Sequence, residues 1–66
     1  MDYATRHAEM TRTYALIEIA RAEVAAASRA IHFPDVVARR RMHAEAALDR
    51  ASDAFTAAFN APVDSH

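Results

Sequence analysis

The sequence predicts an all-α protein, an antiparallel hairpin of two long helices that pairs with a second copy into a four-helix bundle. Of its 66 residues, 18 are Ala and none is Gly, and Ala, Leu, Met, Glu and Arg are the residues that favour helix most strongly. Pro34 divides the chain near its middle. Apolar residues recur every seven positions on both sides of this proline, which is the spacing of a coiled coil.

The first helix is expected over about residues 2–32. Asp2 is suited to the N-cap, because a carboxylate there accepts a hydrogen bond from a free backbone N–H of the first turn. The helix should end near His32 or Phe33, since a residue that precedes proline is pushed out of the helical conformation. The heptad series of this helix is formed by Tyr3, Met10, Ile17, Val24 and Ile31, with Thr13, Ala20 and Ala27 between them.

The second helix is expected over about residues 34–60. Pro34 fits the first helical position, where no N–H is required, and Asn60 followed by Pro62 favours termination. Residues 1–61 would then form one helical hairpin, and residues 62–66 a short flexible C-terminal tail. The heptad series of this helix is formed by Val37, Ala44, Ala51 and Ala58, with Leu48 and Phe55 between them.

Folding the chain back at Pro34 brings together residues whose numbers sum to about 68. Large residues then face small ones, as in the pair Ile17 and Ala51 and the pair Val24 and Ala44, and this keeps the volume of each layer nearly constant. The same rule pairs Met10 with Ala58, Thr13 with Phe55, Ala20 with Leu48, and Ile31 with Val37. The alternative fold is one continuous helix that is kinked at Pro34.

Each helix has more apolar surface than one partner helix can cover. A lone core in a chain below about 70–80 residues seldom supplies more than roughly 3–5 kcal/mol, and this chain has no cysteine for disulfides. We therefore expect a second interface at Leu16, Ile19, Phe33 and Phe59. A two-fold pairing of hairpins is the simplest occupant, and a groove for a helix of another protein is the alternative.

No catalytic, metal or cofactor constellation is recognisable. The sequence has no Glu-x-x-His pair for a carboxylate-bridged metal and no His-Glu-x-x-His. A chain without glycine also lacks the loops that cradle phosphates. No serine or threonine has a convincing base in the hairpin arrangement. We expect a protein that is not an enzyme and that uses no metal or cofactor, with a cofactor held between hairpins by His and Tyr as a weaker alternative.

The stretch around the proline is strongly basic. Residues 28–43 contain four arginines and one acid, a formal charge of +3, whereas the whole chain carries −1. Arg29, Arg39, Arg40 and Arg41 therefore form a candidate contact for an anion or a nucleic acid. The alternative is a solvated helix end, because Asp35 and Glu45 stand four residues from Arg39 and Arg41 and would neutralise them in part.

The functional expectation follows from the apolar surplus. We expect a small non-enzymatic helical interaction protein, a regulator or accessory subunit that forms a homodimer and binds another protein. The alternative is an anion- or nucleic-acid-binding bundle that uses the arginine-rich end. The lack of cysteine and of an apolar run of about 18–20 residues leads us to expect a cytoplasmic chain outside membranes.

Overall fold

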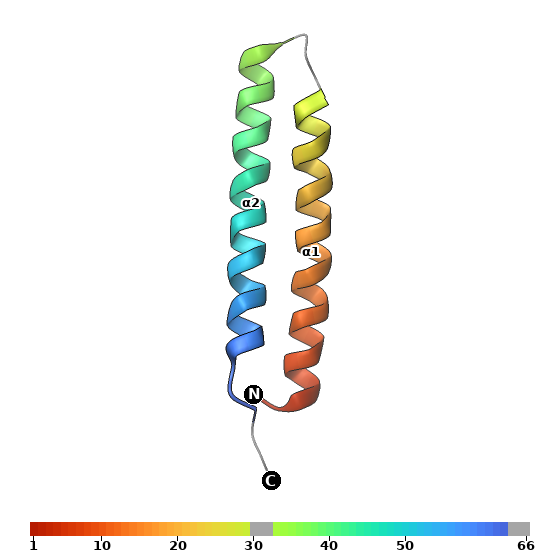
Figure 1. The fold of residues 1–66 in the computed structure, drawn as a ribbon, viewed down its shortest axis with the longest axis vertical. Helices are drawn as coiled ribbons and strands as arrows, with labels where there is room; N and C mark the ends of the chain where they lie inside the picture. Colours follow the sequence, from red (N-terminus) through yellow and green to blue (C-terminus); the bar gives the residue numbers. More distant parts are fainter. Residues whose placement is uncertain (30–32, 64–66) are drawn as a thin grey trace.

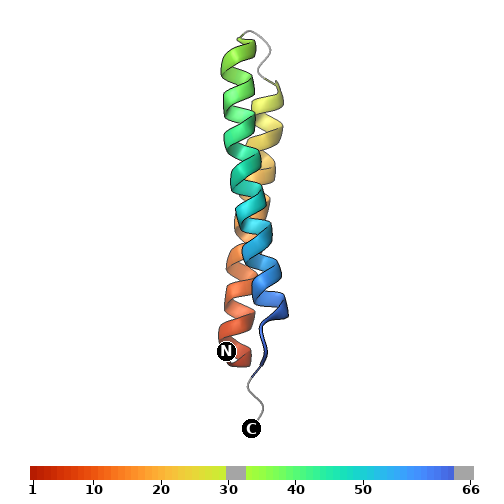
Figure 2. The same ribbon diagram turned by 90° about the vertical axis from the view of Figure 1, so that its left-hand side faces the viewer.

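The computed structural model describes residues 1–29 and 33–63, which form two α-helices, α1 (Tyr3–Arg29) and α2 (Pro34–Asn60). The helices lie side by side and run in opposite directions, so that the start of α1 and the end of α2 lie at one end of the molecule, and the end of α1 and the start of α2 at the other (Figure 1). A view from the side shows the two helices crossing at a shallow angle (Figure 2). The predicted all-α antiparallel hairpin is confirmed. The last residues expected in the first helix, 30–32, lie outside the described residues.

The start of α1 is capped as expected. The backbone N–H of Thr5 donates to Oδ1 of Asp2 at 2.6 Å, and the N–H of Arg6 donates to the Asp2 carbonyl at 3.0 Å. Hydrogen bonds from Thr5 hold the pKa of the Asp2 carboxyl below its ordinary value, because they stabilise the ionised form. The Asp2 side chain thus satisfies one of the donors that a helix N-terminus leaves free, while its carbonyl accepts the first hydrogen bond of the helix.

The ends of α2 also match the prediction. Pro34 occupies the first helical position, and the first backbone bond of the helix runs from the N–H of Val37 to the Phe33 carbonyl at 2.9 Å. After Asn60 the chain turns to an extended conformation at Ala61, whose N–H donates to the Ala58 carbonyl at 3.3 Å. Within the expected tail, residues 64–66 lie outside the described residues.

The seam between the helices buries only small side chains. Thr13 is the largest fully buried side chain among the described residues, and its hydroxyl donates to the Glu9 carbonyl at 2.7 Å. This bond removes the cost of burying an unpaired hydroxyl. The other buried residues are Ala20, Ala27, Ala44, Ala51 and Ala58.

The large residues of the two heptad series are half-buried rather than buried. They are Met10, Ile17, Val24, Val37, Leu48 and Phe55. Tyr3 was expected to join this seam, and that expectation is wrong, because its side chain is 68% exposed. The reason is geometric: α2 ends at Asn60, so no helical residue stands opposite Tyr3. Ile31, the last member of the first series, lies outside the described residues.

The hairpin exposes more surface than its mass accounts for. Its accessible surface is 5112 Å², whereas a folded monomer of 7.3 kDa is expected to expose about 4,200 Å². Its radius of gyration is 15.5 Å, against about 11 Å for a compact domain of this length. The excess is what two helices without further layers produce. Neither helix of the described part has an apolar run that could cross a membrane.

Candidate interaction surface

The small buried residues and the large half-buried residues lie on different sides of the seam. Leu16 comes three residues after Thr13 and four before Ala20, so it lies on the side of the small residues. Tyr14 comes four residues after Met10 and three before Ile17, which places it on the side of the large ones. The hairpin therefore has two unlike faces.

The side of the small residues is hollowed along its length. One concavity is lined by Leu16, Ile19, Ala20, Glu23, Ala47, Arg50, Ala51 and Ala54. A second, of about 560 Å³, lies nearer the turn and is lined by Glu23, Ala26, Ala27, Val36, Arg39, Arg40, His43 and Ala44. Glu23 lines both, so the two concavities adjoin, and we treat them together as one groove. We call the residues that line it the groove face.

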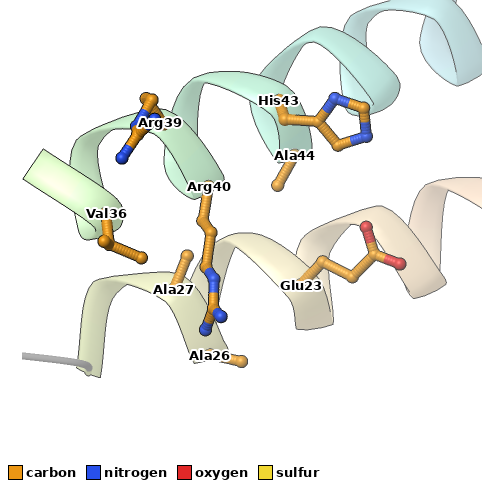
Figure 3. Close-up of a pocket in the computed structure, with 8 residues that line it drawn as sticks. All are labelled: Glu23, Ala26, Ala27, Val36, Arg39, Arg40, His43 and Ala44. Atoms are coloured by element: carbon orange, nitrogen blue, oxygen red, sulfur yellow. The ribbon is translucent and has the colours of Figure 1, made fainter.

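The two edges of the groove carry different side chains. Leu16, Ile19 and Glu23 stand on the α1 edge, which is apolar and acidic. The α2 edge is basic and otherwise formed mainly by alanine. Figure 3 shows Arg40 extending from α2 toward Ala26 and Ala27 of α1, whereas Arg39 remains on the α2 side. The basic residues of the α2 edge are Arg39, Arg40, His43 and Arg50.

Aromatic rings cover part of the opposite side near the chain ends, where Tyr14 and Phe59 are themselves 56% and 55% exposed. The ring centroids of Tyr14 and Phe55 lie 6.4 Å apart, as do those of Phe55 and Phe59. Arg6 reaches across from α1, where its Nη2 donates to the Phe59 carbonyl at 2.6 Å and its guanidinium lies 5.6 Å from the Phe59 ring centroid. We call Tyr14, Phe55 and Phe59 the aromatic face. The contact between Tyr14 and Phe55 agrees with the expected register, in which facing residues sum to about 68.

The structure brings together only part of the predicted partner interface. Leu16 and Ile19 line the groove, and both are exposed. Phe59 belongs to the aromatic face, where it already contacts Phe55 and Arg6. Phe33 directly precedes α2 at the turn and is 70% exposed. Leu16 and Ile19 therefore lie on the groove face, whereas Phe59 lies on the aromatic face and Phe33 at the turn end.

The predicted arginine cluster is spread around the turn end. Arg29 is the last residue of α1, and Arg39 and Arg40 line the groove. Arg41 lines a separate concavity with Met42, and its Nε lies 2.9 Å from Oε1 of Glu45, as the spacing of four predicted. The other arginines of this cluster have no ion-pair partner in residues 1–29 and 33–63.

The expected ion pair between Asp35 and Arg39 is absent from the described part of the chain. Both side chains are exposed, and water solvates each of them, so the pair offers little free energy to offset the ordering of two side chains. This leaves the groove end more basic than the sequence suggested. Of the predicted neutralising contacts, only the one between Glu45 and Arg41 is formed.

Sequence reasoning did not single out Glu23 and His43 as a pair. They lie on opposite helices, line the same concavity, and point the same way along the groove (Figure 3). The signal that could have found them was the row of small residues at Ala20, Ala27 and Ala44, which marks the floor of a groove. Within the residues described, no group of three or more His, Cys, Asp or Glu is placed to hold a metal ion.

Comparisons with known proteins find none that is similar to this chain. No protein-family model matches the chain, and neither the curated proteins nor the solved structures contain a match. The groove face and its chemistry are therefore the basis for a functional proposal.

Proposed function

We propose that this chain is a small, non-enzymatic interaction protein whose groove face binds a second copy of itself to form a four-helix bundle. The observation that carries the proposal is the unfinished core, in which Thr13 is the largest fully buried side chain of the described residues. Fully burying a Leu or Ile side chain contributes about 1.5–3 kcal/mol. Leu16 and Ile19 are left outside, so a hairpin on its own forgoes this stabilisation.

The surface area supports the same conclusion. The excess over a compact monomer is roughly 900 Å² per chain when the observed 5112 Å² is set against the surface expected for its mass. A stable interface of standard size buries about 800 Å² on each partner. Covering the groove face with one more hairpin would therefore bring the exposed surface of each chain into the range of folded proteins.

A second copy suits the groove better than an unrelated helix does. A two-fold interface must be complementary to itself, and the groove face offers both halves of such a fit. The α1 edge presents large apolar side chains, Leu16 and Ile19, and the α2 edge presents small ones, Ala47 and Ala54. In the resulting dimer, Phe33, Arg29 and Arg41 at the turn end lie outside the groove face and would remain accessible to another protein, as expected for a regulator or accessory subunit.

The alternative function is anion or nucleic-acid binding at the turn end. It is favoured by one observation, that Arg39 and Arg40 line a groove without an ion-pair partner among the described residues. Guanidinium groups bind phosphate strongly when they are not already paired. Binding would then weaken steeply with salt and with Arg39→Ala plus Arg40→Ala, and no binding of RNA or DNA at low salt would exclude this alternative.

The test of the main proposal is the mass of the protein in solution. We expect light scattering to give a dimer, and circular dichroism to show loss of helix on dilution. Ile19→Lys places a charge in the groove and should weaken pairing at least about 30-fold, the effect of losing a central contact worth about 2 kcal/mol. Met42→Lys is the matched control, because Met42 is equally apolar and 70% exposed but lies outside the groove.

Two results would contradict the proposal. One is a stable, fully helical monomer at all concentrations, which would show that the groove face needs no cover. The other is equal weakening by Ile19→Lys and Met42→Lys, which would place the interface elsewhere. A poorly folded monomer would indicate that a different protein occupies the groove.

A further inference from the structure

The two edges of the groove are complementary to each other rather than to themselves. The α1 edge is large, apolar and acidic at Leu16, Ile19 and Glu23, and the α2 edge is small and basic. The two-fold axis that relates the second hairpin to the first can run parallel to the helices (along them) or perpendicular to them (across them). An axis along the helices places α1 of each copy on α2 of the other, whereas an axis across them places like helices together.

We propose that the two copies pair with the axis along the helices, so that both turns lie at the same end of the bundle. This proposal rests on the proposed function, since it specifies how the second copy occupies the groove face. It is carried by two kinds of complementarity, of size and of charge, that follow from the register of the hairpin.

Size complementarity follows from the level of each residue along the bundle. In one hairpin, residues at the same level sum to about 68, as the contact between Tyr14 and Phe55 shows. With the axis along the helices the same rule holds between copies. Ile19 then comes level with the segment between Ala47 and Ala51 of the second copy, and Leu16 with the segment between Ala51 and Ala54. Large side chains meet small ones, as close packing requires.

Charge complementarity favours the same arrangement. Glu23 comes level with the segment between His43 and Ala47 of the second copy, and Arg50 of that copy lies about 1.5 Å from the level of Ile19. An acid on one edge thus faces a basic edge, an arrangement that raises specificity and disfavours wrong pairings. The exposed stem of Arg50 can also cover Ile19 while its guanidinium stays in water.

The axis across the helices lacks both forms of complementarity. Leu16 and Ile19 would then meet the same residues of the second copy, while the alanines of the two α2 edges would meet each other. The two α1 helices would therefore stand farther apart than the two α2 helices. If Leu16 of one copy is placed level with Ile19 of the other, Arg50 comes level with Ala51 and therefore beside a second Arg50. Like charges would meet at the closest approach of the helices.

Single cysteines distinguish the two arrangements, because the chain contains none of its own. We would prepare Ile19→Cys and Arg50→Cys, check by circular dichroism that each is helical, and oxidise them separately and as a mixture. A disulfide requires Cα atoms within about 7 Å. The proposed pairing therefore predicts a disulfide between the Ile19→Cys chain and the Arg50→Cys chain in the mixture, and little when the Arg50→Cys variant is oxidised alone. Met42→Cys, outside the groove, is the control for random collision.

The opposite result would overturn the inference. A homodisulfide of the Arg50→Cys variant that forms as fast as the mixed disulfide, in a protein that light scattering shows to be a dimer, would establish the axis across the helices and leave the proposed function standing. A monomeric mass with no disulfide above the Met42→Cys control would instead refute the pairing itself. The two failures are thus told apart by mass.

Discussion

The groove face and the aromatic face are built by the same two helices, yet large half-buried side chains fill the seam on the aromatic face and small ones line it on the groove face. On the aromatic face, Phe55 contacts both Tyr14 and Phe59, and Arg6 spans the helices. On the groove face, the seam positions of α2 that correspond to Phe55 are held by alanines, and Leu16 flanks the seam there as Tyr14 flanks it on the aromatic face. The same alanine-rich composition therefore fills the seam on one side and leaves a groove on the other, according to which side receives the large seam residues.

This difference separates two tasks within one small chain. The large half-buried residues hold each hairpin together, because they fill the space between the helices. The small residues let the helices approach and leave Leu16 and Ile19 exposed, where the second copy of the proposed dimer would cover them. Substitutions on the two faces should therefore fail in different ways.

The largest effect is expected from Phe55→Ala. Truncating a fully buried Phe costs about 3–5 kcal/mol, and since Phe55 is half-buried we expect a loss of about 2 kcal/mol in the free energy of unfolding. Urea denaturation at fixed protein concentration measures this loss, with exposed Thr56→Ala as its neighbouring control. Equal stability of the two variants would show that the aromatic face does not hold the hairpin.

Ala20→Leu should give the next largest effect. Ala20 is 4% exposed on the floor of the groove, so the larger side chain would force the helices apart at a cost of about 1–3 kcal/mol. Ala22→Leu makes the same change at an exposed position of α1 and should alter the free energy of unfolding by less than about 0.5 kcal/mol. An Ala20→Leu variant with a higher free energy of unfolding would show that the groove floor accommodates a leucine without forcing the helices apart.

A smaller loss is expected from Arg6→Met, which keeps the apolar stem but removes the hydrogen bond to the Phe59 carbonyl. A hydrogen bond from a charged donor contributes about 1.5–3 kcal/mol when buried, and we expect about 1 kcal/mol at this partly exposed site. Thermal unfolding measures the change. Arg12→Met, whose guanidinium bonds Glu9 of its own helix, is the control. An equal loss in both variants would show that the bond across the helices adds nothing.

The smallest effect is the response to acid. The pKa of Asp2 is lowered by hydrogen bonds from Thr5, and that of Glu9 by Arg12, from ordinary values of 3.8 and 4.5. A carboxyl whose pKa is lowered in the folded state stabilises that state at pH values above the ordinary pKa of the carboxyl. This stabilisation disappears as the pH falls through the lowered pKa of the folded state. Thermal midpoints should drop slightly as the pH falls from about 5 to about 3, and Asp2→Asn should flatten that drop. A midpoint that rises on acidification would contradict the assignment.

Most of the fold could be predicted because its signals are local. Asp2, Pro34 and Asn60 mark helix ends through their own backbone chemistry, and the seven-residue spacing identified every half-buried seam residue discussed above. Tyr3 was misplaced because periodicity does not reveal where the partner helix stops. Whether a residue near the start of α1 has a helical neighbour depends on where α2 ends, and that residue is far away in the sequence.

The candidate surface was predicted less completely. Leu16 and Ile19 stand out as apolar residues beside the seam, and they do line the groove. Phe59 was grouped with them because the two flanks of a seam cannot be told apart in a sequence. The flank to which a residue belongs depends on the neighbouring side chains that it packs against. Glu23 and His43 come from different helices, so their shared concavity emerges only once the helices are placed together.

The position of the chain ends has a practical consequence. The amino group of Met1 lies 3.5 Å from the Pro62 carbonyl, at the end of the hairpin opposite the turn (Figure 1). In the proposed dimer, with both turns at the same end, Met1 and Pro62 of both copies would lie at the other end, so a short linker could join two copies in tandem. Such a fusion would raise the effective concentration of one hairpin for the other. Gene duplication would thus turn the proposed assembly into a single chain without changing the helix packing.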